Sequence, residues 1–382
     1  MLFLPEFFFS KENKIEKNHV IKTTSDGIII DIIPFEKIKN NNDIIHLKGL
    51  LIPGLINSHC HLELSWAKGH CKANKGIEFF YNEMKGIHKK APSNEEINSS
   101  IEKIITHLKN QGVAAVADTS NTSISISEKK KSNVFFHTFL EIVGTDSEKA
   151  QEIFNNIIKA SSLFDKENLS NSISIHTLFT LSDSLMELSS KKIKDSRNTN
   201  SIHFLESIEE KNYYEKKKLF DFSKESKYNS AAEAACKLLP LENRTLFVHN
   251  TFATEQDLDI ILNNFKDAWF CFCPSSNLFI NNKLANIPLF YTKTSNILIG
   301  TDSICTNKEM DLFNDIDIIL KNYPDLKIEQ LLMAATINGA RFLNIEKQYG
   351  SIEKNKKPGL IQIEDYKPGL KNFKDFKKNV IF

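Results

Sequence analysis

Short apolar stretches recur along this chain, and polar or amphipathic segments separate them. Eight of the stretches have the length and composition of buried strands. They span residues 50–56, 113–117, 134–140, 172–175, 201–205, 245–248, 269–273 and 296–299. Helical spacing of apolar residues occurs between them, for example in 95–109 and 147–163. Strands that alternate with helices form parallel sheets, so eight units predict an α/β fold of the (β/α)8 TIM barrel type.

The two ends of the chain have a different pattern, in which β-type runs alternate with turns. Neither end is long enough to bury a core alone, so we expect them to combine in a small β-sandwich. The predicted domains are a composite β-sandwich of 1–47 and 346–382, and a barrel of 48–345. Residues 206–240 are long and charged for one connection, which predicts a helical insertion near the barrel mouth.

Composition narrows the class of protein. The 382 residues are 41% hydrophobic and 25% charged with a net charge of +1, so no basic surface indicates nucleic acid. The six cysteines show no regular spacing, which favours free thiols in a reducing, cytoplasmic compartment. The sequence has no apolar run near the ~18 residues that span a bilayer, and the apolar start resembles a strand more than a signal peptide.

The chemistry centres on His59 and His61, which end an apolar run. Residues i and i+2 of a strand point to the same face, so both imidazoles can reach one metal ion. His203, His249 and Asp302 each follow a later strand-like run. In a barrel the C-terminal strand ends meet at one face, which predicts a shared site there. His59, His61, His203 and Asp302 form a ligand set that suits Zn²⁺, although Fe²⁺ and Mn²⁺ accept the same ligands.

A carboxylate and a further imidazole accompany the predicted metal ligands. Glu206 lies three residues after His203, where it can carry a proton to or from a metal-activated water. His249 adds an imidazole on the next strand. The metal interpretation outweighs chance, because a lone His-x-His is often structural but these residues recur at successive strand ends.

The motifs together resemble the amidohydrolase superfamily over nearly the whole chain. They are Pro-Gly-Leu-Ile-Asn-Ser-His-Cys-His at 53–61, His203 with Glu206, His249, Gly-Thr-Asp-Ser at 300–303 and the tail at 350–360. The family's usual glycine before the tail lysine is Asn355 here. Residues 172–177 read Ser-Ile-Ser-Ile-His-Thr and hold no lysine to bridge two metals, so the resemblance is to the mononuclear deaminase branch.

The resemblance implies hydrolytic deamination of a purine-like ring by a metal-activated water. Glu206 would then move a proton to a ring nitrogen, and His249 would stabilise developing charge. Asp302 would relay a proton to ammonia, and His176 would contact substrate. His61-Leu-Glu-Leu-Ser and Cys273-Pro-Ser-Ser-Asn are similar to the subgroup that contains aminodeoxyfutalosine deaminase.

Two other functions remain open at this stage. One is hydrolysis of another C–N bond, in a cyclic amide, a formimidoyl group or a dipeptide, and ammonia release would separate it from deamination. The other is a catalytically silent barrel used for binding, which usually loses metal ligands or the proton carrier. The partner expected is a small-molecule substrate, with no nucleic acid and no membrane, and similar proteins suggest a homodimer.

Several other polar or aromatic residues are candidates for substrate contact. Trp66, Glu141 and Asn277 are predicted contacts; the alternative for Trp66 is packing of the loop, and the alternative for Glu141, as for Glu78, is a solvated face. Glu63 has two alternatives, a carboxylate that orients a ligand histidine or a partner of a buried backbone amide.

Overall fold

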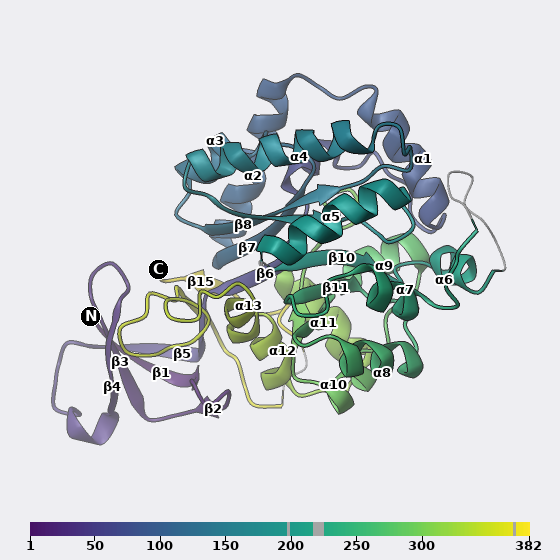
Figure 1. Ribbon diagram of the computed structural model, residues 1–382. Helices are drawn as coiled ribbons and strands as arrows, with labels where there is room; N and C mark the ends of the chain where they lie inside the picture. Colours follow the sequence, from purple (N-terminus) through teal and green to yellow (C-terminus); the bar gives the residue numbers. More distant parts are fainter. Residues whose placement is uncertain (197–198, 217–224, 370–371) are drawn as a thin grey trace.

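Seven of the eight predicted strands are present, and with β6, which lies later in the chain than the predicted 50–56, they form two four-stranded parallel sheets. The computed structural model describes residues 1–196, 199–216, 225–369 and 372–382. One sheet has the order β6-β7-β8-β9 and the other β10-β11-β12-β13 (Figure 1). Their bounds are β6 Leu55–Cys60, β7 Val113–Ser120, β8 Phe135–Ile142, β9 Ser170–Ile175, β10 Asn200–Phe204, β11 Thr245–His249, β12 Ala268–Phe272 and β13 Ile297–Ile299.

Hydrogen bonds link the outer strands of one sheet to those of the other. Between β9 and β10, the His203 amide donates to the His176 carbonyl oxygen at 2.9 Å. Next to β13 and β6, the amides of Thr301 and Asp302 both donate to the His59 carbonyl oxygen at 3.0 Å. These hydrogen bonds connect the two sheets at two places, one at His203 and one at His59.

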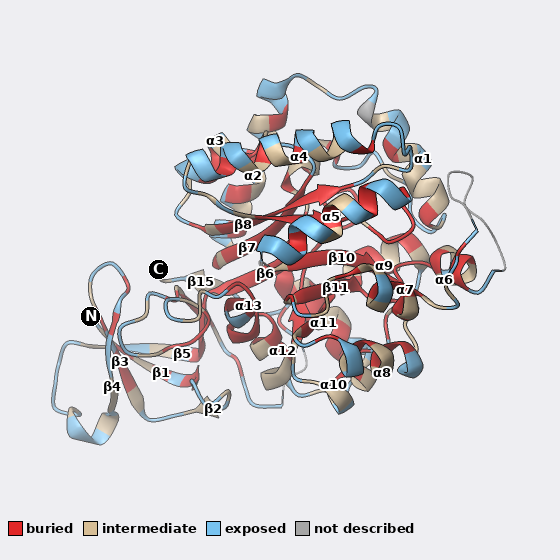
Figure 2. Ribbon diagram, in the orientation of Figure 1, coloured by how far each residue is buried: buried red, intermediate tan, exposed pale blue. Residues whose placement is uncertain are grey.

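Helices cover the outer faces of the two sheets and turn their apolar sides inward. In α2 the buried residues Ile97, Ile101, Ile105 and Leu108 recur at helical spacing. Figure 2 shows buried strands inside and exposed outer faces on the helices. The helices are α1 Ile77–His88, α2 Asn94–Asn110, α3 Ile126–Lys131, α4 Ala150–Lys166, α5 Asp183–Ser196, α6 Ile208–Tyr214, α7 Ala231–Leu238, α8 Glu255–Asn264, α9 Pro274–Asn281, α10 Ile287–Lys293, α11 Leu312–Asn322, α12 Ile328–Ala334 and α13 Ile337–Phe342, with 3-10 turns η1 Phe35–Lys37 and η2 Leu62–Ala67.

Both ends of the chain join in one seven-stranded sheet, beside the helical body in Figure 1. Its path is β15-β14-β5-β1-β3-β4, with β2 paired to β1. The bounds are β1 Leu2–Phe9, β2 Ile15–Glu16, β3 His19–Thr23, β4 Ile29–Pro34, β5 Ile44–Pro53, β14 Leu360–Ile363 and β15 Lys378–Val380. The joint β-unit of the two termini is thus observed, while the sandwich shape and the domain boundaries stay predictions.

The apolar run at 50–56 differs from the prediction of a single strand. It holds the end of β5 and the start of β6, and Gly54 separates them. A Cβ at Gly54 would lie 2.6 Å from the Pro358 carbonyl oxygen and 2.8 Å from the Ala114 Cβ. This crowding, which comes from residues distant in sequence, explains the glycine between the two strands.

The long connection at 206–240 contains helices, as its composition suggested. It includes α6 and α7, and residues 217–224 of the predicted insertion lie outside the described residues. Among the described helices, none is both long enough and apolar enough to cross a membrane.

Candidate active site

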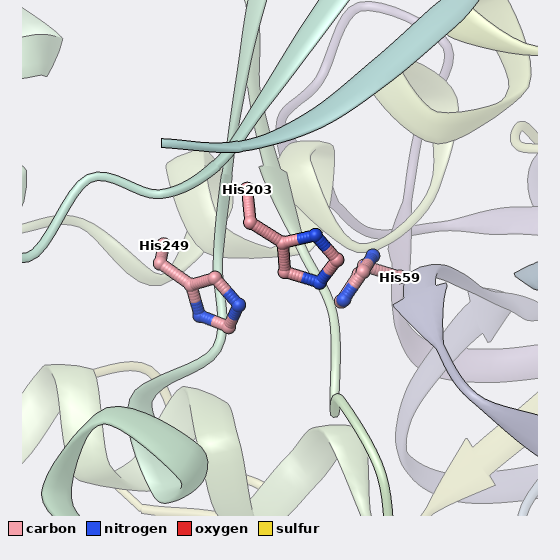
Figure 3. Close-up of side chains that lie close together, drawn as sticks. All are labelled: His59, His203 and His249. Atoms are coloured by element: carbon pink, nitrogen blue, oxygen red, sulfur yellow. The ribbon is translucent and has the colours of Figure 1, made fainter. Parts of the chain in front are cut away.

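Three histidine rings from three different strands converge at the C-terminal strand ends. Figure 3 shows His59, His203 and His249 facing one region. The ring centroids of His59 and His203 are 5.0 Å apart, and those of His203 and His249 are 5.3 Å apart. All three are buried. The period-2 geometry of β6 also brings His61 here, with its ring centroid 4.9 Å from that of His59.

The ligand-type atoms of this cluster are close enough to share one ion. His61 Nε2 lies 3.3 Å from His203 Nε2 and 3.4 Å from Asp302 Oδ1. His59 Nε2 lies 3.7 Å from the same carboxylate oxygen. The donor atoms of His59, His61 and Asp302 all fall within 4.8 Å of one another, as do those of His59, His203 and His249.

The donor set fits a divalent cation. Within the described part of the chain, the buried His59 Nε2 has no hydrogen-bond partner. A buried polar atom without a partner is costly, and a cation at this point would satisfy it. Three imidazoles and one carboxylate are also the donor types that zinc accepts in proteins.

The partner of each Nδ1 atom distinguishes the roles of the histidines. His203 Nδ1 lies 3.2 Å from the His176 carbonyl oxygen and 3.1 Å from Glu141 Oε1. Both partners only accept, so Nδ1 carries the proton and Nε2 offers a lone pair to a metal. His249 Nδ1 instead lies 3.2 Å from the Asn277 amide nitrogen, which donates. His249 Nε2 then carries the proton and is a donor.

Asp302 is held with one oxygen turned toward the histidines. Its Oδ2 accepts hydrogen bonds from Ser276 Oγ at 2.5 Å and Thr306 Oγ1 at 3.0 Å, which leaves Oδ1 beside His59 and His61. Burial acts to raise the pKa of Asp302, but its interactions with the nearby histidines, first of all His59, keep that pKa well below its usual value. The carboxylate is therefore ionised.

Glu206 is a buried carboxyl group that lies close to both His249 and Asp302, since ligand-type atoms of the three residues fall within 4.8 Å of one another. Its Oε1 lies 3.7 Å from His249 Nε2. Burial raises the pKa of Glu206 to about 8, so this group exchanges a proton near neutral pH. Its backbone amide donates to Glu210 Oε2 at 3.0 Å, which fixes the turn where β10 ends.

The strand ends that carry these groups have left-handed backbone conformations. The φ angles are +45° at Leu205, +74° at His249 and +61° at Asp302. Such conformations are uncommon for residues other than glycine and cluster at functional sites. They turn the chain sharply at the point where each functional side chain leaves its strand.

Of the other predicted substrate contacts, His176, Glu141 and Asn277 lie around the cluster. The His176 ring centroid is 5.0 Å from that of His203, and its Nδ1 lies 2.9 Å from Thr180 Oγ1. Glu141 and Asn277 lie behind His203 and His249. Trp66 lies in η2, with its ring centroid 6.1 Å from that of His70.

The two remaining glutamates have different surroundings. Glu63 accepts hydrogen bonds from the Asn121 amide at 3.0 Å and from Ser120 Oγ at 2.7 Å. These contacts agree with the backbone-partner alternative for Glu63. Glu78 lies in the first turn of α1.

The structure adds residues to the neighbourhood that the sequence had not indicated. The ring of Tyr81, on α1, lies 5.9 Å from the His176 ring centroid. Burial raises the pKa of Tyr81 well above its usual value, and the negative charge of Glu206 adds to this effect. Ser276 lies inside the Cys-Pro-Ser-Ser-Asn motif, whereas Thr306 and Tyr81 carry no signal in the sequence.

Comparison with known proteins agrees with this geometry. The family described as the amidohydrolase family matches residues 50–381. An adenosine deaminase of Helicobacter pylori is 27% identical over 328 residues, which cover 81% of this chain and 78% of that protein.

Solved structures share the fold of the chain. The crystal structure of Helicobacter pylori aminofutalosine deaminase in complex with methylthio-coformycin has a TM-score of 0.83 at 22% identity, covering 99% of this chain and 97% of that one. An adenosine deaminase from Xanthomonas campestris with bound zinc has a TM-score of 0.74 at 18% identity, covering 95% and 84%.

Proposed function

Because the chain belongs to the amidohydrolase family, we propose that it replaces an exocyclic amine on a purine-like ring with oxygen and releases ammonia. It is a metal-dependent hydrolase of carbon–nitrogen bonds, and its relatives are deaminases. The observation that carries the proposal is the buried Glu206 carboxyl group, 3.7 Å from His249 and beside the ligand cluster. A metal-binding barrel without catalysis would not need a proton carrier at that position.

One divalent ion, proposed to be Zn²⁺, would be held by His59, His61, His203 and Asp302. The tautomer argument supports His203 as a ligand, and the unpartnered Nε2 supports His59. When bound, such an ion supplies Lewis-acid chemistry that makes water a stronger acid.

The protein side chains divide the proton transfers between them. Glu206 takes a proton from the attacking water and gives it to a ring nitrogen, for which a raised pKa makes it a competent base. His249 donates from Nε2 to the oxygen that develops negative charge. Asp302, held by Ser276 and Thr306, passes the second proton of water to the departing amine, so that ammonia leaves.

The substrate is proposed to lie between His176 and the covering helix α1. His176, Trp66, Glu141 and Asn277 are the proposed contacts or their supports. The ring of Tyr81 near His176 adds an aromatic face suited to a heteroaromatic substrate. An aminodeoxyfutalosine-like compound is the favoured substrate, which the short motifs after His61 and Cys273 support.

We also infer that the eight parallel strands close into a (β/α)8 barrel. The hydrogen bonds of His203 with His176 and of Thr301 with His59 support closure. A separate apolar cluster at the termini, containing Phe8, Ile21 and Leu360, supports a small β-sandwich of 1–47 and 346–382 beside a barrel of 48–345. The six free cysteines support the proposed cytoplasmic location.

The test is ammonia release by the zinc-loaded protein. The panel holds 6-aminodeoxyfutalosine, adenosine, methylthioadenosine, S-adenosylhomocysteine, guanine and cytosine. Rapid turnover of one compound is expected, and it would name the substrate. One metal bound per chain with no ammonia from any compound would contradict deamination of these rings and favour hydrolysis of another C–N bond.

A further inference from the structure

Lys129 and Asp118 form a fully buried ion pair next to the chain segment that follows His61. Lys129, on α3, places Nζ 2.5 Å from Asp118 Oδ2 and 2.6 Å from Thr138 Oγ1. Both charged side chains have 0% exposure. The ammonium also lies 5.1 Å from the ring centroid of Phe164 and 5.7 Å from that of Phe136. Burying two charges is costly, so stability alone does not explain this ion pair.

The other oxygen of Asp118 reaches the chain immediately after His61. Asp118 Oδ1 accepts a hydrogen bond from the Leu62 backbone amide at 2.7 Å. Asp118 lies on β7 opposite Cys60, where the register between β6 and β7 shifts after Asn57. The regular ladder is therefore interrupted where the ligand histidines leave β6, and Asp118 provides a replacement contact.

We propose that Lys129 and Asp118 are a positioning pair that fixes the His61–Leu62 peptide and thereby sets the metal affinity of the site. Lys129 balances the charge of Asp118 and orients its carboxylate, and Asp118 holds Leu62. The direction of the His61 side chain follows, with Nε2 3.4 Å from Asp302 Oδ1. The inference rests on the metal site proposed above. It goes beyond that site because it assigns a role to Lys129 and Asp118, which are not among the proposed metal ligands or substrate contacts.

A second residue, Glu63, also anchors the η2 turn, but at a different point from the Lys129–Asp118 pair. Glu63 binds the loop after β7 through Ser120 and the Asn121 amide. Glu63 thus connects η2 to the loop after β7, while Asp118 acts on the peptide between His61 and Leu62. Loss of the pair should therefore loosen His61 without unfolding the whole turn.

The test compares zinc affinity and the stability of the metal-free protein in three variants. Lys129→Met leaves Asp118 buried without its partner and should weaken zinc binding by about 10- to 100-fold, the range typical when a partner of a ligand is lost. Lys131→Met is the matched control, because Lys131 lies on the same helix with 67% side-chain exposure. Its zinc affinity should stay within about twofold of the wild type.

The double variant Asp118→Leu/Lys129→Met separates positioning from folding. Replacing a buried ion pair by apolar side chains is often neutral for stability. We therefore expect a folded, metal-free protein with an unfolding midpoint near that of the wild type and with weakened zinc binding. A folded double variant that binds zinc as the wild type does would overturn the inference.

A measurement on the wild-type protein covers the case in which the variants do not fold. The Leu62 amide of the metal-free protein should be as protected from hydrogen exchange as amides of β7, and fast exchange would overturn the inference. Failure of wild-type protein to bind any metal would instead overturn the proposed function. The two failures are thus distinguishable.

Discussion

Gly300 offers a direct test of how closely β13 and β6 must approach to form the site. It lies between β13 and Asp302, and an added Cβ would lie 2.8 Å from the Cβ, N and O atoms of His59. Ordinary contacts start at 3.4 Å, so Gly300→Ala requires a shift of about 0.6 Å. Two of the three atoms belong to the backbone of β6, which cannot rotate away.

Two opposing effects decide whether Gly300→Ala raises or lowers the free energy of unfolding. Gly-to-Ala at a compatible backbone position stabilises by about 0.4–1 kcal/mol, because the unfolded chain loses freedom. Overpacking in a close-packed interior costs about 1–3 kcal/mol. The clash should prevail, so Gly300→Ala should lower the free energy of unfolding by about 1–2 kcal/mol. The shift also exceeds the roughly 0.2 Å tolerance of metal–ligand distances, so zinc affinity should fall by at least about tenfold.

The assay is urea unfolding of the metal-free protein together with zinc competition against a chelating dye. Gly86→Ala is the matched control, since Gly86 lies in α1 and a Cβ there would meet nothing within 4 Å. That variant should gain about 0.5–1 kcal/mol and keep its zinc affinity. Wild-type stability and wild-type zinc affinity in Gly300→Ala would refute the argument from close approach.

Three further predictions concern the proposed site. Glu206→Gln should keep one metal per chain and lower kcat by about 10²- to 10⁴-fold. Glu152→Gln, at an exposed position, is the control and should leave kcat unchanged. A normal kcat in Glu206→Gln would show that Glu206 is not the proton carrier. His203→Ala should lower metal content measured by elemental analysis, and an unchanged content would exclude it as a ligand. Burial raises the pKa of Glu206 to about 8 from 4.5, so the folded state holds this proton more tightly than the unfolded state does. The stabilising contribution is complete below pH 4.5 and is lost as pH rises toward 8. Urea unfolding of the metal-free wild type should show this decline, Glu206→Gln should lack that part of it, and equal slopes would contradict the assignment.

Much of the site followed from local patterns in the sequence. Period-2 spacing is sufficient to place His59 and His61 on one face, because strand geometry fixes the direction of alternate side chains. The position of His203 and His249 at the ends of apolar runs is also local information. Parallel strands then bring those ends together without any further signal.

Contacts between distant segments were not predictable in the same way. In the run at 50–56 the Pro53-Gly54 pair separates the two strands, but the crowding that requires Gly54 comes from the distant Pro358 and Ala114. Lys129 begins a run of three lysines, which is typical of a solvated helix face. Only the packing of α3 shows that Lys129 points inward while Lys131 does not.

The sequence also did not predict which groups a residue at a strand end contacts. Glu141 ends a predicted strand, which suggested substrate contact, but its carboxylate lies 3.1 Å from His203 Nδ1. It therefore supports His203, a proposed metal ligand, from behind, and a role toward substrate stays a prediction. Thr306 shows the same difficulty, because its hydroxyl reaches Asp302 through a turn with no recognisable motif.

Side-chain hydrogen bonds accompany the three left-handed strand ends of the site. Leu205, His249 and Asp302 each adopt a backbone conformation that costs about 1–3 kcal/mol and persists only when its surroundings enforce it. Beside each of these strand ends a side chain makes a hydrogen bond: Glu210 accepts from the Glu206 amide, Asn277 bonds the His249 ring and Ser276 donates to the Asp302 carboxylate. None of these three bonds involves a metal. The protein's own hydrogen bonds therefore hold the His249 ring and the Asp302 carboxylate, and in the proposed function a metal ion would bind beside an Asp302 carboxylate that is already oriented.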